Sequence, residues 1–148
     1  MISCRDLRNI LRKPYAELDK PSAEVCCEII FFLSRHSSSE LNHITYQTIM
    51  NGIRPNTASK FHDNEELIVS MMRSMDYLTS SKLKLLEINF QYYGPNDEEP
   101  TELDKDDLAQ AIVEGKFYHP ESGDEIKDFR KYIFPYFSPS EKWVLVNG

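Results

Sequence analysis

Carboxylate side chains are dense in the stretch between residues 97 and 107, and carboxylate oxygens are ligands for hard cations such as calcium. The residues are Asp97, Glu98, Glu99, Glu102, Asp104, Asp106 and Asp107. A calcium-binding EF-hand loop needs a central glycine and a terminal glutamate in register, and this stretch has neither. We therefore expect no metal here. The stretch suits a basic macromolecule, with solvated helix N-termini as the alternative explanation, because Asp and Glu favour the first turn of a helix.

A second group of potential metal ligands lies close together around Gly123. His119, Glu121 and Asp124 could each donate a nitrogen or an oxygen atom. Their spacing matches no zinc signature, and no cysteine is near them in the sequence. The pattern is typical of a surface turn, so we expect neither a metal nor a cofactor.

Nucleophilic catalysis has no signature in this sequence. The chain contains no G-x-S-x-G motif, no P-loop and no glycine-rich dinucleotide turn. His36, His43 and His62 are spread along the first half, and a catalytic triad assembled in space stays open as an alternative. We name no catalytic residue and keep an enzyme of unknown chemistry as the third functional hypothesis.

The net charge of the chain is concentrated in its last third. Residues 1–96 contain 11 Lys and Arg and 11 Asp and Glu, whereas residues 97–148 contain 6 and 13. The formal net charge of −7 therefore belongs to residues 97–148. Such asymmetry favours a protein partner with a basic surface over a nucleic acid, since phosphate contacts need a basic stripe.

Aromatic side chains follow the acidic stretch and strengthen this interpretation. Tyrosine and tryptophan supply much of the contact energy in protein interfaces, although packing in the core is the alternative role. The first hypothesis is thus a small acidic protein that binds another macromolecule as a regulator, inhibitor or subunit, including one that occupies a nucleic-acid-binding groove. The predicted partner-binding residues are Asp97, Glu98, Glu99, Asp104, Asp106, Asp107, Tyr132, Tyr136 and Trp143.

The cellular compartment is predicted from the cysteines and from the longest apolar run. Three cysteines occur, Cys4, Cys26 and Cys27, and the odd number favours free thiols in a reducing compartment over a vicinal redox pair. The run Val25 to Leu33 has nine residues and includes Glu28, which is about half of a membrane span. We expect a cytoplasmic protein with no membrane contact, in an oligomeric state that the sequence leaves open.

The elements that must position these residues are organised around residues 63–93. Asp63 and Glu66 have the spacing of a capping box, and a helix follows. Its predicted buried face carries Leu67, Ile68, Met71, Met72, Met75 and Leu78. From Leu86 to Tyr92 apolar and polar residues alternate, which predicts a strand with its even-numbered side chains in the core.

Further helices are expected on both sides of this centre. Their predicted ranges are residues 3–13, ended by Pro14; 21–36, apolar on nearly every face and so central to the core; 45–51, ended by Gly52; 104–114, ended by Gly115; and a last helix opened by Ser122 and closed by Pro135. Residues 143–146 are predicted to form a terminal strand that pairs with Leu86–Tyr92.

The order of these elements suggests a winged helix-turn-helix. Residues 21–36, 45–51 and 63–78 would be its helices, and residues 83–93 its wing. The link 53–62 is long for this motif, and residues 37–93 carry five basic and six acidic side chains, which suits DNA poorly. A winged-helix DNA-binding regulator is therefore the second functional hypothesis.

These patterns together predict the fold class. We expect an α+β protein that is mainly helical, with about five to six helices, a small antiparallel sheet and a winged-helix-like centre as one interpretation. A length of 148 residues suits a single globular domain, with the acidic third 97–148 as part of it.

Overall fold

The computed structural model describes residues 4–57 and 64–147. By packing, the chain divides into two compact parts, which we call the helical unit (Met1–Glu87 with Phe137–Gly148) and the acidic unit (Ile88–Tyr136). The described residues form six α-helices and a three-stranded antiparallel sheet, which confirms the predicted fold class. That all 148 residues behave as one domain stays a prediction.

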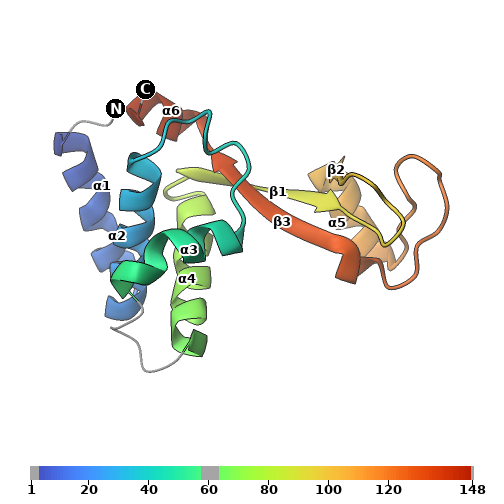
Figure 1. Ribbon diagram of the computed structural model, residues 1–148, viewed down its shortest axis with the longest axis horizontal. Helices are drawn as coiled ribbons and strands as arrows, with labels where there is room; N and C mark the ends of the chain where they lie inside the picture. The colour runs from blue at the N-terminus through green and yellow to red at the C-terminus, as the bar shows by residue number, and fades with distance from the viewer. Residues whose placement is uncertain (1–3, 58–63, 148) are drawn as a thin grey trace. The chain divides into compact units, whose positions relative to one another are not determined.

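The helical unit is built around one central helix. Its helices are α1 (Cys4–Glu17), α2 (Lys20–Ser34), α3 (Tyr46–Thr57), α4 (Asn64–Thr79) and α6 (Glu141–Asn147). Helix α2 packs against α1, α3 and α4, as Figure 1 shows. It begins at the N-cap Asp19, whose carboxylate accepts a hydrogen bond from the Ser22 amide. The central position predicted from its apolar sequence is thus confirmed.

Helix α4 lies against α2 through methionines and serines. Met71 and Met75 are 3% and 0% exposed, as predicted. Ile68 and Met72 were expected on the same face, but they are 41% and 47% exposed, and this part of the prediction is wrong. The buried face of α4 contains Ser70 and Ser74 instead. The Ser74 hydroxyl lies 2.7 Å from the Ser70 carbonyl oxygen and 2.8 Å from that of Ser22 on α2, so a buried serine is satisfied there.

Two helices continue past the residues that were predicted to end them. Helix α1 runs through Pro14 to Glu17. Helix α3 begins after Thr45, whose hydroxyl accepts a hydrogen bond from the Thr48 amide at 3.2 Å, and it runs through Gly52. A Cβ atom at Gly52 would overlap the ring of Phe32 on α2. The glycine therefore allows close helix packing, and the predicted turn at this residue is wrong.

The strands are β1 (Leu86–Tyr92), β2 (Thr101–Leu103) and β3 (Ile133–Pro139), in the order β2-β1-β3. Strand β1 has the predicted bounds. It pairs antiparallel with β2, with Phe90 opposite Leu103. The boundary between the two units falls within β1 and β3. In the helical unit, Ile44 exchanges two backbone hydrogen bonds with Phe137, at 2.8 and 2.6 Å.

The C-terminal elements differ from the prediction. In place of a helix from Ser122 to Pro135, turns lead into the short 3-10 helix η2 (Phe129–Tyr132) and then into β3. Pro135 disfavours a helix interior, and its aromatic neighbours suit a strand. The expected strand at 143–146 is instead part of α6. The Ser140 hydroxyl accepts a hydrogen bond from the Trp143 amide at 3.2 Å and so caps this helix.

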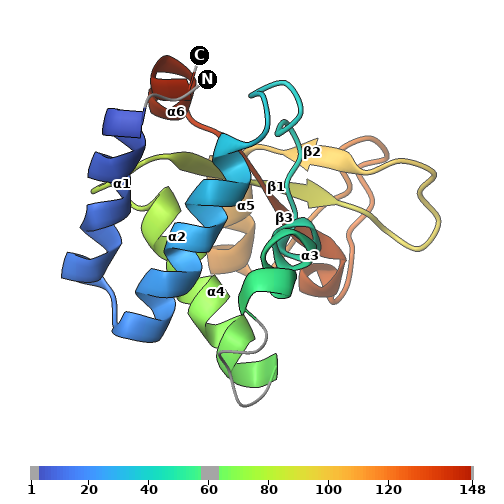
Figure 2. The same ribbon diagram turned by 60° about the vertical axis from the view of Figure 1, so that its left-hand side comes forward.

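The acidic unit carries helix α5 (Lys105–Glu114), which has nearly the predicted bounds (Figure 2). Asp104 caps its N-terminus by accepting hydrogen bonds from the amides of Asp106 and Asp107, at 2.9 and 3.0 Å. Gly115 ends it in the left-handed conformation, with φ of 74°. The core of the unit consists of Tyr92, Ala111, Phe117 and Phe129, with Leu103, Ile126, Tyr132 and Ile133 packed around them.

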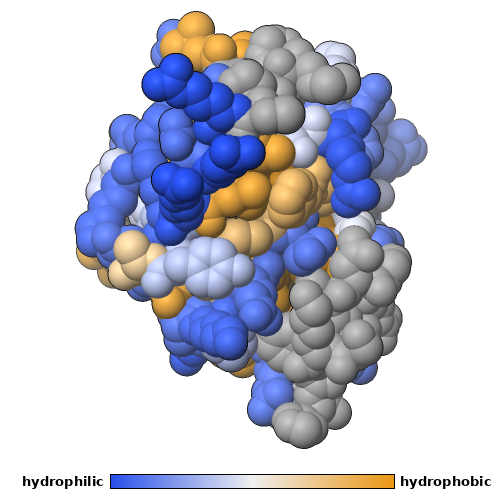
Figure 3. Space-filling model, turned by 90° about the vertical axis from the view of Figure 1, so that its left-hand side faces the viewer, coloured by the Kyte–Doolittle hydropathy of each residue, from blue (hydrophilic) through white to orange (hydrophobic). Residues whose placement is uncertain are grey.

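Apolar side chains also reach the surface of the helical unit. Figure 3, seen from the α1 side of Figure 1, shows an apolar area bordered by hydrophilic residues. Nothing in the described residues indicates what would cover this area, so we assign it no role. Within the described residues, no helix has both the length and the apolar character needed to cross a membrane.

Candidate functional site

The division of the chain by packing is also a division by charge. The acidic unit contains 12 Asp and Glu and 5 Lys and Arg, whereas the rest of the chain contains 12 of each kind. The entire net charge of −7 therefore belongs to a unit of 49 residues. A field of one sign attracts partners of the opposite sign and speeds their encounter.

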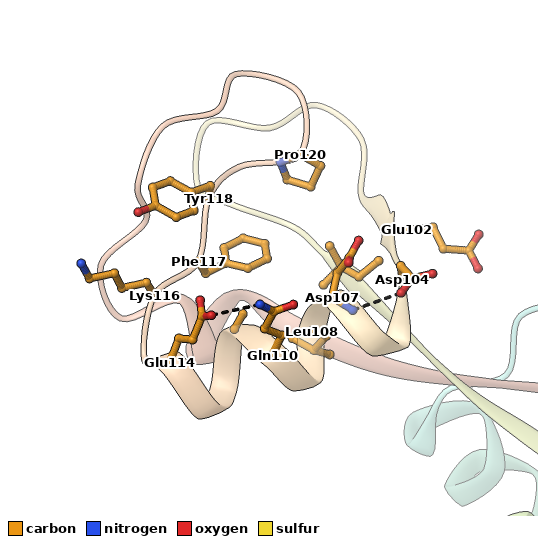
Figure 4. Close-up of a pocket in the computed structure, with 12 residues that line it drawn as sticks. Glu102, Asp104, Asp107, Leu108, Gln110, Glu114, Lys116, Phe117, Tyr118 and Pro120 are labelled. Atoms are coloured by element: carbon orange, nitrogen blue, oxygen red, sulfur yellow. Dashed lines mark hydrogen bonds between the residues drawn. The ribbon is translucent and has the colours of Figure 1, made fainter.

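The acidic unit has a pocket of about 420 Å³ between α5 and the segment that follows this helix. Figure 4 shows Phe117 between α5 and the turn that carries Pro120. Leu108, Ala111 and Phe117 supply an apolar floor. The acidic side chains that line the pocket are Glu102, Asp104, Asp107 and Glu114, beside a single lysine, Lys116.

The four carboxylates are held in different ways. Glu102 shares a hydrogen bond with Tyr136. The Asp104 carboxylate already accepts hydrogen bonds from the amides of Asp106 and Asp107, so it is less available to pair with a cation from a partner. Glu114 Oε1 accepts a hydrogen bond from Gln110 Nε2 at 3.0 Å, which fixes this carboxylate one turn along the same helix (Figure 4). The Asp107 carboxylate has no hydrogen-bond or ion-pair partner among the described residues. Asp107 and Glu114 are thus the charges best placed to receive a cation.

The floor of the pocket packs on two further aromatic rings. The Phe117 ring stacks on Phe129 with the centroids 5.3 Å apart, and it also packs against Tyr92 at 5.3 Å. An apolar floor under an acidic rim matches a side chain that has an aliphatic stem and a cationic head. Lysine and arginine have this form.

His119, from the second group of potential metal ligands, has its ring engaged within its own loop. Its Nε2 lies 3.3 Å from Asp97 Oδ1, and its Nδ1 accepts hydrogen bonds from the amides of Glu121 and Ser122, at 3.1 and 3.3 Å. The ring is therefore the Nε2–H tautomer, and both nitrogens are engaged within the loop. No group of three His, Cys, Asp or Glu side chains in the described part of the chain is arranged to hold a metal ion.

The structure distributes the nine predicted partner-binding residues over several places. Asp104 and Asp107 line the pocket. Glu98, Glu99 and Asp106 are exposed outside it, and Asp97 is engaged by His119.

The three predicted aromatic residues lie further inside. Tyr132 packs on the ring of Tyr92 at 6.1 Å. Tyr136 is partly buried, and burial, together with a hydrogen bond to Glu102, raises its pKa above the usual value. Trp143 is fully buried on α6 in the helical unit, where it has the core role that was the alternative in the sequence.

Sequence reasoning missed several residues that line the pocket. Glu102 was counted only among the carboxylates of residues 97–107, and Glu114, Lys116 and Phe117 were not considered as site residues. The helix end predicted at Gly115 could have indicated them. A chain that reverses direction at this glycine places the following residues alongside the helix.

The thiols of α2 agree with the expectation of free cysteines. Burial strongly raises the pKa of Cys26, and burial likewise raises the pKa of Cys27 above its usual value. The Cys27 thiol donates a long hydrogen bond, 3.5 Å, to the Leu11 carbonyl oxygen. Thiols kept protonated in this way are poor nucleophiles, which argues against a redox pair.

No protein-family model matches this chain, and no curated protein or solved structure is significantly similar to it. The functional argument rests on the geometry and the charge of the acidic unit.

Proposed function

We propose that this protein acts by binding a partner with a basic surface, and that the acidic pocket receives a lysine or arginine side chain of that partner. One observation carries the proposal. The same pocket has an acidic rim and an apolar floor packed on aromatic rings, and it lies in the unit that holds all of the net charge. Regulators, inhibitors and subunits of complexes work in this way.

Charge and apolar contact have different parts in this proposal. An exposed ion pair stabilises a complex by only about 0–1 kcal/mol, so the rim alone would bind weakly and without selectivity. Each buried methylene contributes about 0.8 kcal/mol, so a lysine stem laid on Leu108 and Phe117 contributes more than its ion pair. The charge of the unit then sets the rate of encounter, and the floor sets the choice of side chain.

A matched pair of double variants tests the proposal. Asp107→Asn with Glu114→Gln removes two charges from the pocket, and Glu98→Gln with Glu99→Gln removes two exposed charges outside it. The probe is a fluorescein-labelled hexa-arginine peptide, and the measurement is its Kd by fluorescence polarisation at low salt. We expect a rise in Kd of about tenfold for the pocket variant and about twofold for the control.

Equal losses in the two variants would show that the peptide senses only the overall charge, and the pocket would then have no part in binding. Variants that pass this test serve next as bait against extracts of the native cell, where a genuine partner should bind the control variant and not the pocket variant.

A second candidate function is a winged-helix regulator that binds DNA. It draws support from one observation: Ile44, between α2 and α3, forms an isolated antiparallel β-bridge with Phe137, at the place where a winged helix would have a short strand. Against DNA binding, the first turn of α4 carries Glu65 and Glu66. Fluorescence polarisation with a fluorescent 20-base-pair duplex, measured from low to high salt, tests this function. Binding at low salt whose affinity falls steeply with salt would support it, and no binding at low salt would contradict it.

A further inference from the structure

The acidic unit has a second hollow, an apolar groove of about 300 Å³. Phe90 of β1, Ile133 of β3, and Ala109 and Ile112 of α5 form its apolar walls. This volume is at the lower end of the range for small-molecule pockets, so a compact ligand would fill it.

The charge of the groove is opposite to that of the unit around it. Lys105 and Arg130 line it, and they are two of only five basic residues in the acidic unit. None of the unit's 12 Asp and Glu residues is among the lining residues. Of the carboxylates near Lys105 in the sequence, Asp104 and Asp107 line the acidic pocket instead, and Asp106 lines neither hollow. The groove is thus lined by apolar walls with two basic residues and no acidic one.

Arg130 is held in place at the end of α5. Its Nη2 donates a long hydrogen bond, 3.5 Å, to the carbonyl oxygen of Ile112, and its guanidinium lies 6.0 Å from the centroid of the Phe129 ring. A cation at a helix C-terminus is stabilised by the helix dipole. A guanidinium has five N–H groups, so an arginine that uses one of them here still has donors for an anion.

We propose that this groove binds a small amphipathic carboxylate, with an aryl or branched alkyl body between Phe90, Ile112 and Ile133 and its carboxylate paired with Lys105 and Arg130. The apolar walls exclude phosphate, sulfate and other wholly polar anions as good ligands, because those ions gain nothing from apolar contact. The net charge of −7 on the surrounding unit disfavours anions with several charges, so the ligand carries one.

Three compounds that share a phenylalkyl group and differ only in their terminal group test the ligand class. The probes are 4-phenylbutyrate, 4-phenylbutan-1-ol and 4-phenylbutylamine, and the measurement is the Kd from amide shifts in two-dimensional NMR of the full chain. We expect the carboxylate to bind at least about tenfold more tightly than the alcohol, through two charge-assisted hydrogen bonds, and the amine more weakly still. The shifts should centre on Ala109 and Ile112. Equal affinity of carboxylate and amine, or shifts centred elsewhere, would overturn the proposal.

Two pairs of variants test the residues. Lys105→Gln with Arg130→Gln should weaken phenylbutyrate at least about tenfold. Lys127→Gln with Lys131→Gln makes the same change of charge at two exposed residues that line neither the groove nor the acidic pocket, and it should leave the Kd within about twofold. Ala109→Phe fills the groove from an exposed helix position and should abolish binding, whereas Val113→Phe, four residues along and outside the groove, should not.

The Ala109→Phe pair keeps both cations and tests the groove even if the charge variant is unstable. A binding constant that is unchanged in Ala109→Phe would overturn the proposal. This inference is independent of the acidic pocket, since none of its four variants changes a carboxylate.

Discussion

Asp97 and His119 lock a loop of the acidic unit: Nε2 of the imidazole lies 3.3 Å from Oδ1 of the carboxylate, while Nδ1 accepts two backbone amides. Asp97 also accepts a hydrogen bond from the amide of Gly94 at 2.9 Å. A histidine with a carboxylate partner is often read as catalytic, but a base needs a free nitrogen, and this one has none. The pair therefore joins two turns that are 22 residues apart in the sequence.

His119→Ala should therefore destabilise the acidic unit by about 1–3 kcal/mol, because the amides of Glu121 and Ser122 and the Asp97 carboxylate lose their partner. The measurement is urea unfolding followed by the NMR signals of α5. Glu121→Ala, an exposed position in the same loop, is the control and should change stability by less than about 0.5 kcal/mol. A His119→Ala protein as stable as this control would show that the ring is dispensable.

Helix α4 carries two methionines three residues apart that differ in burial. Met75 is fully buried and Met72 is about half exposed. Met75→Ala should cost about 2–5 kcal/mol, the usual range for a large-to-small change in a core, and Met72→Ala less than about 0.5 kcal/mol. Chemical denaturation with circular dichroism detection checks both. Similar losses would mean that the orientation of α4 is incorrect.

Gly52 provides a test of the contact between α2 and α3. In an exposed helix, Gly→Ala stabilises by about 1 kcal/mol, but here the new Cβ meets the ring of Phe32. We expect Gly52→Ala to be destabilising in the natural chain and to become neutral or stabilising beside Phe32→Ala. A double-mutant cycle of the unfolding free energies measures this coupling. Additive effects would contradict the close approach of the two helices.

The buried thiol of Cys26 makes stability depend on pH in the alkaline range. Burial raises its pKa in the folded chain, so the unfolded chain ionises first as the pH rises. Stability should be fully present below the ordinary thiol pKa of about 8.5 and should fall as the pH increases above it. Cys26→Ala should reduce this slope between pH 8 and pH 9, where Cys27 contributes a smaller part. Toward pH 10, tyrosines whose pKa is raised by burial, such as Tyr136, add to the slope in both proteins. Unfolding curves at several pH values give the result.

The prediction of one domain can be tested with the single tryptophan. Trp143 lies in the helical unit, so its fluorescence follows that part, while the amide signals of α5 follow the acidic unit. One cooperative domain should give urea midpoints that coincide for both probes. Two separate midpoints would show that the two compact units are also two folding units.

The elements were predictable from the sequence wherever one local signal dominated. Strand β1 follows from the alternation between Leu86 and Tyr92, and α5 follows from the cap at Asp104 and the stop at Gly115. The segment from Ser122 to Pro139 was mispredicted because it presents two competing signals, a helical spacing of apolar residues and a dense run of aromatics. Pairing with β1 decides between them, and a partner strand more than 40 residues away is invisible to local pattern.

The sequence by itself determined the fold class, the central helix α2 and the location of the negative charge, because composition and periodicity act along the chain. Only the tertiary structure decided which carboxylates share a pocket. Asp107 and Glu114 line the same pocket as Phe117 because the chain reverses at Gly115 and returns along α5. Asp97, from the same acidic stretch as Asp107, contacts His119 instead. The tertiary structure also placed Trp143 in a core and brought Lys105 and Arg130 to the lining of one groove, since contacts between distant residues depend on how the elements pack and not on their spacing in the sequence.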